Sequence, residues 1–107
     1  MLEAIMQITF FAKNEAIYEA WLGYDARRTF RPVFNLGGRL FSANITSNEL
    51  MYYWDKEYSV CVQFFTIDTP SLYSAIADEL VAGKTYNIQM GSKVIGQAVL
   101  LDYCYSE

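Results

Sequence analysis

The stretch that most constrains the fold lies near the C-terminus, at residues 83–102 (GKTYNIQMGSKVIGQAVLLD). Residues 85–90 alternate between apolar and polar side chains, and the apolar set is Tyr86, Ile88 and Met90. This period of two predicts a strand that buries these three side chains. A turn at Gly91 leads into a second strand at 93–103, where Gly96 predicts strong coiling or a close approach of another backbone. The segment is therefore expected to be an antiparallel hairpin.

Similar alternation predicts four further strands, at residues 4–12, 29–36, 39–46 and 57–67. The side chains expected to face inward are Met6, Ile8, Phe10, Phe30, Phe34, Leu36, Val60, Val62 and Phe64. Gly37-Gly38 is a typical hairpin turn. Pro32 lacks an N–H group, so its strand position should be an edge or a bulge. Residues 13–27 are expected to be an irregular excursion, and Leu50 to Trp54 an aromatic connection.

One helix is predicted, at residues 70–81. Thr69 can cap it, and Pro70 suits the first helical position, where its missing N–H group costs nothing. An apolar stripe at four-residue spacing consists of Leu72, Ile76 and Leu80. Gly83 is expected to end the helix in a left-handed conformation.

These elements predict an all-β fold, a small closed barrel of six or so antiparallel strands with one short helix. Closure is favoured because it removes exposed edges, which matters for strands this apolar. A length of 107 residues fits a single domain over residues 1–107, and 53% hydrophobic residues suffice for a compact core.

Charge and composition narrow the classes of function. The net charge of −4 argues against non-specific nucleic-acid binding, which needs a basic field. The chain has no histidine and two cysteines, Cys61 and Cys104, so no zinc site, other metal site or cofactor is expected. A disulfide between the two stays open, because they can lie on neighbouring strands. No apolar run is long enough to cross a membrane and no secretory signal is visible, so a cytoplasmic location is expected.

Two clusters are candidate partner-binding sites. The first is the arginine cluster Arg27, Arg28, Arg31 and Arg39. Arg31 and Arg39 can lie on one rim of the barrel and grip an anionic partner. Alternatively, Arg27, Arg28 and Arg31 pair with carboxylates such as Asp25 and Glu19. Residues 50–54 (LMYYW) are rich in side chains that are enriched at interface cores. Their aromatic members, Tyr52, Tyr53 and Trp54, either form an exposed patch that docks a protein or plug one end of the barrel.

The segment 83–100 (GKTYNIQMGSKVIGQAVL) resembles the last hairpin of the C-terminal barrel domain of elongation factor Tu. The matching positions are Gly83, Tyr86, Ile88, Gly91, Lys93, Ile95-Gly96 and Val99. Upstream, Arg31-Pro32-Val33-Phe34 is similar to that domain's Arg-Pro-x-Phe strand, and residues 8–15 to its first strand. The resemblance extends over roughly residues 4–103 and is specific in the final hairpin and at Arg31-Pro32. It implies a six-stranded Greek-key barrel; in the full factor this domain contacts the GTPase domain, aminoacyl-tRNA and the exchange factor.

The chain departs from that family mainly in its loops. It has neither the phosphate loop nor the guanine-reading motif of a GTPase. Trp54-Asp55-Lys56 replaces the family's Pro-Gly-Asp turn, an acidic and aromatic stretch replaces its Asp-Glu-Gly-Gly-Arg segment, and the helix at 70–81 replaces a short connection. Loops usually carry function, so the resemblance supports the fold more than the activity.

The sequence therefore favours a non-catalytic binding module. No nucleophile motif is present and histidine is absent, so no catalytic residue is assigned and an enzyme is not expected. The preferred partner is a protein; RNA is disfavoured by the acidic charge. An alternative is an immunity or antitoxin-like protein that neutralises a basic toxin by charge complementarity. A third hypothesis, a small-ligand barrel, requires space inside a barrel that side chains usually fill. The partner's identity and the oligomeric state are not determined by these patterns.

Overall fold

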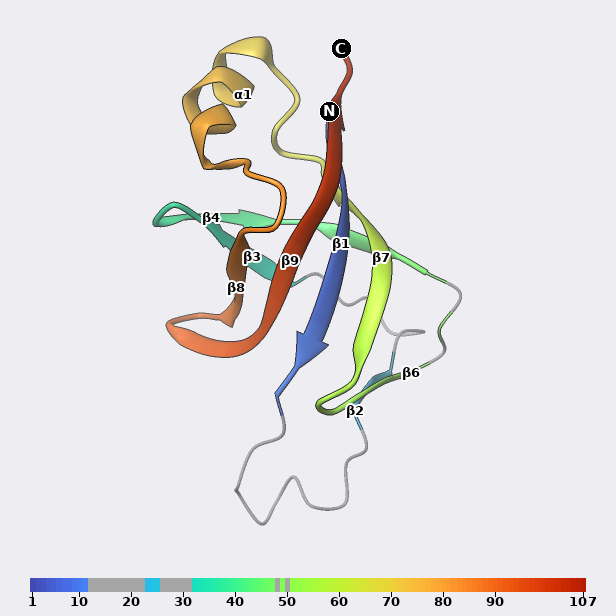
Figure 1. The fold of residues 1–107 in the computed structure, drawn as a ribbon. Helices are drawn as coiled ribbons and strands as arrows, with labels where there is room; N and C mark the ends of the chain where they lie inside the picture. Colours follow the sequence, from blue (N-terminus) through green and yellow to red (C-terminus); the bar gives the residue numbers. More distant parts are fainter. Residues whose placement is uncertain (12–22, 26–31, 48, 50) are drawn as a thin grey trace.

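The computed structural model describes residues 1–11, 23–25, 32–47, 49 and 51–107 (Figure 1). This part of the chain is mostly antiparallel β-strand with one short α-helix. Its elements are β1 (Leu2–Phe10), β2 (Gly23–Asp25), β3 (Val33–Leu36), β4 (Arg39–Ser42), β5 (Asn44–Thr46), β6 (Met51–Tyr53), β7 (Glu57–Phe64), α1 (Pro70–Ile76), the 3₁₀ helix η2 (Ala77–Glu79), β8 (Thr85–Met90) and β9 (Lys93–Tyr105). Within these ranges, no helix has the length and apolarity needed to cross a membrane.

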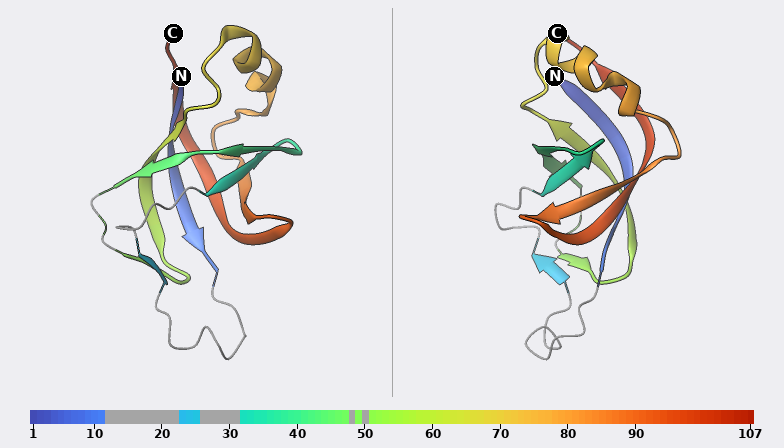
Figure 2. Two further views of the ribbon diagram at one scale, coloured as in Figure 1. Left: turned by 180° about the vertical axis from the view of Figure 1, so that it is seen from behind. Right: turned by 90° about the vertical axis from the view of Figure 1, so that its left-hand side faces the viewer.

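Seven strands form one sheet in the order β4-β3-β8-β9-β1-β7-β5. The sheet curls into a half-barrel, in which β1 lies between β7 and β9 (Figures 1 and 2). The remaining two strands, β2 and β6, form a separate antiparallel pair near one end of β7. Neither strand was predicted: residues 23–25 carry no clear alternation, and Leu50 to Trp54 was expected to be an aromatic connection, whereas Met51–Tyr53 is strand β6. The rest of the predicted excursion at 13–27 lies outside the described residues.

The core lies on the concave face of the sheet, and it follows the predicted alternation. On β1 the buried side chains are Leu2, Ala4, Met6, Ile8 and Phe10, and on β7 they are Tyr58, Val60, Val62 and Phe64. Phe34 and Leu36 are buried as predicted, whereas Phe30 lies outside the described residues. All buried side chains among the described residues are apolar or aromatic.

The prediction that Met90 is buried was wrong. Its side chain is 54% exposed, although it shares the parity of the buried Tyr86 and Ile88. It is the last residue of β8 and pairs with Lys93 at the hairpin turn. The β8–β9 register shifts between Ile88 and Gln89, just before this end of the strand. The apolar–polar alternation of residues 85–90 therefore extends to Met90, but at this end of β8 no neighbouring strand of the described residues covers the Met90 side chain.

Gly96 lies where two backbones approach closely, as predicted. It pairs with Phe10 on β1 and with Ile88 on β8. A Cβ atom at this position would lie 2.4 Å from the backbone oxygen of Thr9. Only glycine fits there without moving β1. The Gly37-Gly38 turn also has the expected left-handed backbone, with φ of 65° and 93°.

The helix begins as predicted but ends sooner. Thr69 caps it, and Oγ1 of Thr69 accepts a hydrogen bond from the Leu72 N–H at 3.2 Å. The α-helix stops at Ile76 and continues as η2, rather than reaching residue 81. Gly83 is left-handed at φ 88°, yet it lies four residues past the end of η2 and does not cap it. The hydroxyl of Tyr86 on β8 explains the early end. It donates to the Glu79 carbonyl and accepts from the Val81 N–H group, so the main chain at residues 79–81 is bonded to β8 in place of a further helical turn.

Thr69→Ala should lower the free energy of unfolding by about 1 kcal/mol, because loss of the cap leaves one helical N–H group without its partner. The matched control is Ser74→Ala, on an exposed position inside α1, where alanine is the better helix former. Urea unfolding of both variants measures the difference. Equal stability of the two variants would contradict the capping role.

Candidate functional site

The predicted aromatic segment forms β6 and leads into a tight turn at residues 54–56 before β7. The end of β6, this turn and the start of β7 are together called here the aromatic turn (residues 52–58). Asp55 has a left-handed backbone with φ of 57°, and its N–H group donates to the carbonyl of Phe10 at 2.7 Å. The Tyr53 N–H group donates to the hydroxyl of Tyr58 at 3.0 Å. The turn is thus tied both to the end of β1 and to its own second strand, which makes it a defined surface.

Tyr52 belongs to the core. Its ring is 2% exposed and packs against Phe10 at a centroid distance of 5.7 Å and against Tyr58 at 5.1 Å. Its hydroxyl shares a hydrogen bond of 2.5 Å with Oγ of Ser47. Trp54 is half-buried and packs against the same core. Of the two alternatives given for these aromatic residues, Tyr52 and Trp54 therefore fit the second, a plug at one end of the barrel. Their packing on the core supports the turn.

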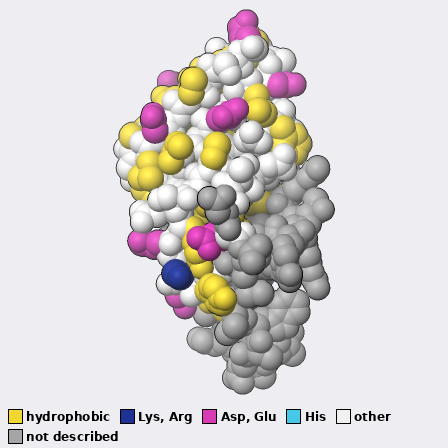
Figure 3. Space-filling model, turned by 90° about the vertical axis from the view of Figure 1, so that its right-hand side faces the viewer, with side chains coloured by type: hydrophobic (Ala, Val, Ile, Leu, Met, Phe, Trp, Pro, Cys, Tyr) yellow, Lys and Arg dark blue, Asp and Glu magenta, His cyan; other side chains and the backbone are white. Residues whose placement is uncertain are grey.

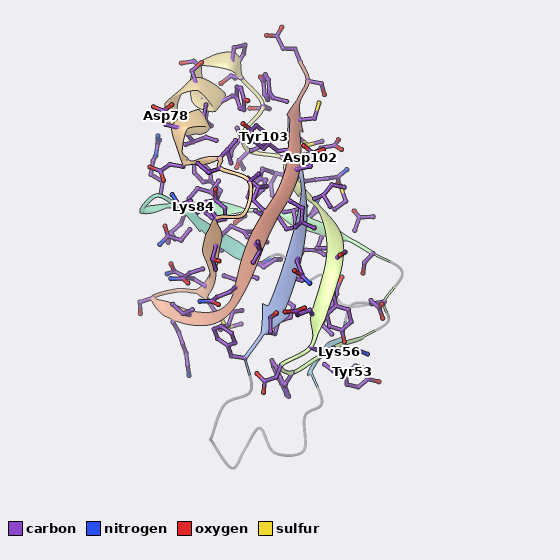
Figure 4. All side chains as sticks on the ribbon, in the orientation of Figure 1. Tyr53, Lys56, Asp78, Lys84, Asp102 and Tyr103 are labelled. Carbon is purple, nitrogen blue, oxygen red and sulfur yellow. The ribbon has the colours of Figure 1, made fainter. Side chains whose placement is uncertain are left out.

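Tyr53 is the exposed member of the set, at 43%. Nζ of Lys56 lies 5.9 Å from its ring centroid and 5.6 Å from that of Tyr58, so one ammonium group faces two aromatic rings. Figure 4 shows Tyr53 and Lys56 together at this end of the molecule. The pair presents an aromatic ring and a positive charge side by side at the surface.

A polar hollow of about 520 Å³ adjoins the aromatic turn. It is lined by Thr46, Ser47, Glu49, Lys56, Glu57, Tyr58 and Ser59. Oε2 of Glu57 accepts a hydrogen bond from Nε2 of Gln7 at 2.8 Å, which orients this carboxylate. The hollow therefore offers hydroxyl groups and carboxylates, together with one ammonium group, to a ligand or partner.

The nucleophilic side chains near these elements are held in their neutral forms. Burial raises the pKa of Tyr52; the hydrogen bond to Ser47 opposes this, and the charge of Glu49 adds to it. Burial also raises the pKa of the Cys61 thiol, with a further contribution from Glu3. A neutral phenol and a neutral thiol are poor nucleophiles at neutral pH.

Tyr52→Phe should reduce the loss of stability at alkaline pH. A phenol whose pKa is raised on folding keeps its proton above about pH 10, where the unfolded chain has released it. Its contribution is therefore present below about pH 10 and is lost as the pH rises through the folded pKa. Urea unfolding at about pH 9 and about pH 11 measures this slope. Leu40→Ala, at an exposed position without a titratable group, is the control and should retain the wild-type slope; equal slopes for both variants would contradict the assignment.

Of the four predicted arginines, the structure describes only Arg39. Arg27, Arg28 and Arg31 lie outside the described residues. Arg39 is exposed on β4, with Cζ 5.8 Å from the ring centroid of Phe41. Figures 1 and 2 place the β3–β4 hairpin apart from the β2–β6 pair, so Arg39 and the aromatic turn do not form one site.

The two cysteines lie on strands that flank β1 rather than on neighbouring strands. Cys61 is on β7 opposite Ile5, and Cys104 is on β9 opposite Glu3. Both are free thiols, Cys61 half-buried and Cys104 exposed. Among the residues that the structure describes, no group of histidine, cysteine and carboxylate side chains is arranged to hold a metal ion.

The polar hollow was missed by sequence reasoning. Residues 47–49 read as a loop, and Glu57 as the first residue of a strand. Their only common signal was an acidic or hydroxyl side chain close to a strand end, which is frequent in any β protein. Strand β5 runs antiparallel to β7 and ends at Thr46 opposite Cys61, so the chain that follows β5 lies toward the start of β7, and Glu49 and Glu57 line one hollow.

No protein-family model and no curated protein match this chain. The resemblance of residues 83–100 to the elongation factor Tu barrel therefore remains a prediction. A function has to be supported by the aromatic turn and the polar hollow themselves.

Proposed function

We propose that this protein is a non-catalytic protein-binding module that contacts its partner through the aromatic turn and the polar hollow. The observation that carries the proposal is the exposed ring of Tyr53 beside Lys56, on a turn anchored by Tyr52. Interface hot spots typically combine an exposed aromatic ring with neighbouring polar groups. The buried cluster beneath Tyr53 keeps the turn in one conformation, which reduces the entropy lost on binding.

The charges near the hollow favour a protein over RNA. Glu49 and Glu57 line it and would repel phosphate groups. Carboxylates outnumber basic groups among the described side chains, and Figure 3 shows acidic side chains spread between apolar ones over the described part of one face. A partner with a basic contact surface complements this arrangement.

The absence of catalysis is part of the proposal. The chain has no histidine, which is the most frequent general base at neutral pH. The raised pKa values of Tyr52 and Cys61 keep both groups protonated. The free thiols of Cys61 and Cys104 fit a reducing compartment, and we include a cytoplasmic location in the proposal.

The scaffold that we propose is a closed six-stranded barrel related to the C-terminal domain of elongation factor Tu. Ala43 alone separates β4 from β5, the two strands at the ends of the sheet order. Its side chain is fully buried, and its N–H group donates to the Pro32 carbonyl at 3.1 Å. Counting β4 and β5 as one bent strand supports closure with six strands in total.

An immunity or antitoxin-like role is the second candidate, and the excess of carboxylates is the observation that favours it. A basic nuclease toxin would be held by the acidic side chains, some of which Figure 3 shows between apolar ones. A gene for such a toxin next to the gene for this chain, together with rescue of growth when both are expressed, would support this role. Lack of rescue would exclude that toxin as the target.

Tyr53→Ala should weaken partner binding by at least tenfold, because loss of an anchoring aromatic ring typically costs about 2 kcal/mol. The measurement is affinity purification from the native cell with mass spectrometry, followed by titration of the purified partner. Leu40→Ala is the matched control, since Leu40 is 52% exposed on the distant β3–β4 hairpin. Equal binding by both variants would remove the aromatic turn from the interface. Recovery of nuclease-sensitive material alone would replace the protein partner by RNA.

A further inference from the structure

A small cavity lies on the outer, convex face of the sheet, next to a β-bulge that interrupts the pairing of β1 with β9. Ile5 pairs with Asp102, whereas Met6 pairs with Leu100, so Leu101 is the extra residue. The cavity next to this bulge, called here the bulge groove, has a volume of about 170 Å³. It is lined by Glu3, Ala4, Ile5, Cys61, Asp102, Tyr103 and Cys104.

The floor of the bulge groove is apolar, and apolar side chains around it are exposed. Ile5 is 47% exposed in the groove, and Leu101 is 46% exposed next to Asp102. These two exposed apolar side chains, together with the apolar floor, give the groove an apolar contact surface. Before the bulge the buried side chains of β9 are Ala98 and Leu100, whereas Asp102 after it is exposed, so the bulge leaves Leu101 and Asp102 both on the exposed side.

Two carboxylates border this apolar floor. Glu3 lies on β1, two residues from Ile5, and its charge is close enough to the Cys61 thiol to contribute to its raised pKa. Asp102 lies on β9, and its Oδ1 accepts a hydrogen bond from the Tyr103 N–H group at 2.8 Å. Figure 4 shows Asp102 and Tyr103 on β9 alongside β1. Neither carboxylate forms an ion pair within the described part of the chain.

Size and charge together define the occupant. A volume of about 170 Å³ is well below the 300–1,000 Å³ of typical small-molecule sites, but a single long side chain needs no more. An apolar floor with carboxylates at its border complements a side chain with an aliphatic stem and a cationic head. Lysine and arginine have this construction, since their stems pack on apolar surface while their charged ends stay in water.

We infer that the bulge groove receives a lysine or arginine side chain of a basic partner protein, with the stem against Ile5 and the charge beside Glu3 and Asp102. This inference rests on the proposed function only in taking the partner to be a protein. It adds a second contact, on the convex face of the sheet and separate from the aromatic turn, and it specifies the chemistry of the group that binds there.

The test uses three blocked tripeptides with leucine on either side of a central lysine, arginine or norleucine. Norleucine keeps an aliphatic stem of similar length and lacks the charge. Binding is followed by the amide NMR signals of the intact protein and by the rate at which iodoacetamide alkylates Cys61 and Cys104. The lysine or arginine peptide should shift the signals of Ile5 and Cys61 and slow alkylation of both thiols. The norleucine peptide should bind about fivefold more weakly.

The double variant Glu3→Gln, Asp102→Asn is the charge control. The side-chain amide oxygen introduced by Asp102→Asn would still accept the Tyr103 N–H bond, so the local backbone should be preserved. All three peptides should then bind equally. If the variant does not fold, about 0.5 M NaCl serves instead and should weaken only the two cationic peptides. Tighter binding of the lysine peptide than of the arginine peptide, or the reverse, identifies which side chain the groove prefers.

Two results would overturn the inference. One is equal binding of the norleucine and lysine peptides to the wild-type protein, which would make the groove a purely apolar contact. The other is the absence of saturable shifts at Ile5 and Cys61. Both results are independent of Tyr53→Ala, so failure of the bulge groove is distinguishable from failure of the aromatic turn.

Discussion

Gly96→Ala is expected to destabilise the protein by about 2–3 kcal/mol, a large share of the stability of a domain this small. The added Cβ atom would lie 2.4 Å from the backbone oxygen of Thr9 and 3.3 Å from Cα of Phe10. These are main-chain atoms of β1, which pairs on both sides with other strands and cannot retreat without disturbing β7. Overpacking against backbone is costly because no rotamer change relieves it.

Gly91→Ala is the matched control for this substitution. Gly91 is also a glycine of the last hairpin, but a Cβ atom there would meet nothing within 4 Å. Its left-handed φ of 61° makes alanine unfavourable by about 1 kcal/mol through local strain alone. Urea unfolding of both variants separates steric overlap from backbone strain. A Gly96→Ala variant as stable as Gly91→Ala would show that β1 and β9 are not in the close contact described here.

Phe64→Ala should cost about 3–5 kcal/mol, the usual range for removing a buried phenylalanine ring. Phe64 is fully buried at the end of β7, and its ring packs edge-on against Phe34 of β3 at a centroid distance of 5.3 Å. The strands β3 and β7 are not hydrogen-bonded to each other, so this pair joins two distant parts of the curled sheet across its concave side. The cavity left by the ring would remove this contact.

The control for Phe64→Ala is Leu40→Ala, at a position that is 52% exposed on β4. Surface substitutions of this kind usually change stability by about 0.5 kcal/mol or less. Thermal and urea unfolding provide the comparison. Phe34→Ala should resemble Phe64→Ala, and the double variant should cost less than the sum of the two, because the residues share one contact. Strict additivity would argue against the packing of these rings across the sheet.

The strands and their buried faces were largely predictable because local alternation is imposed by the strand backbone itself. Met6, Ile8 and Phe10 are buried together, as are Val60, Val62 and Phe64, since side chains two apart share a face. Thr69 and Gly96 were predictable for similarly local reasons. The end of the helix was not, because the hydroxyl of Tyr86, from a later strand, decides where the chain leaves the helix.

The candidate site was only partly predictable. The sequence identified the group Tyr52, Tyr53 and Trp54, but could not distinguish the exposed ring from the buried ones. Alternation along β6 separates Tyr52 from Tyr53, and the packing of Phe10 and Tyr58 decides which of the two faces inward. Lys56 and Glu57 carry no signal in the sequence. They matter only because the turn places them next to Tyr53 and the polar hollow.

The sequence by itself determined the class of secondary structure, the parity of most strands, the helix cap and the close approach at Gly96. Each of these depends on interactions within a few residues or on the size of one side chain. Tertiary structure alone decided that Cys61 and Cys104 flank β1, that the bulge exposes Asp102 beside Leu101, and that Glu49 and Glu57 meet at one hollow. These features depend on which strands pair and in what register, and register is set by contacts between residues far apart in the chain.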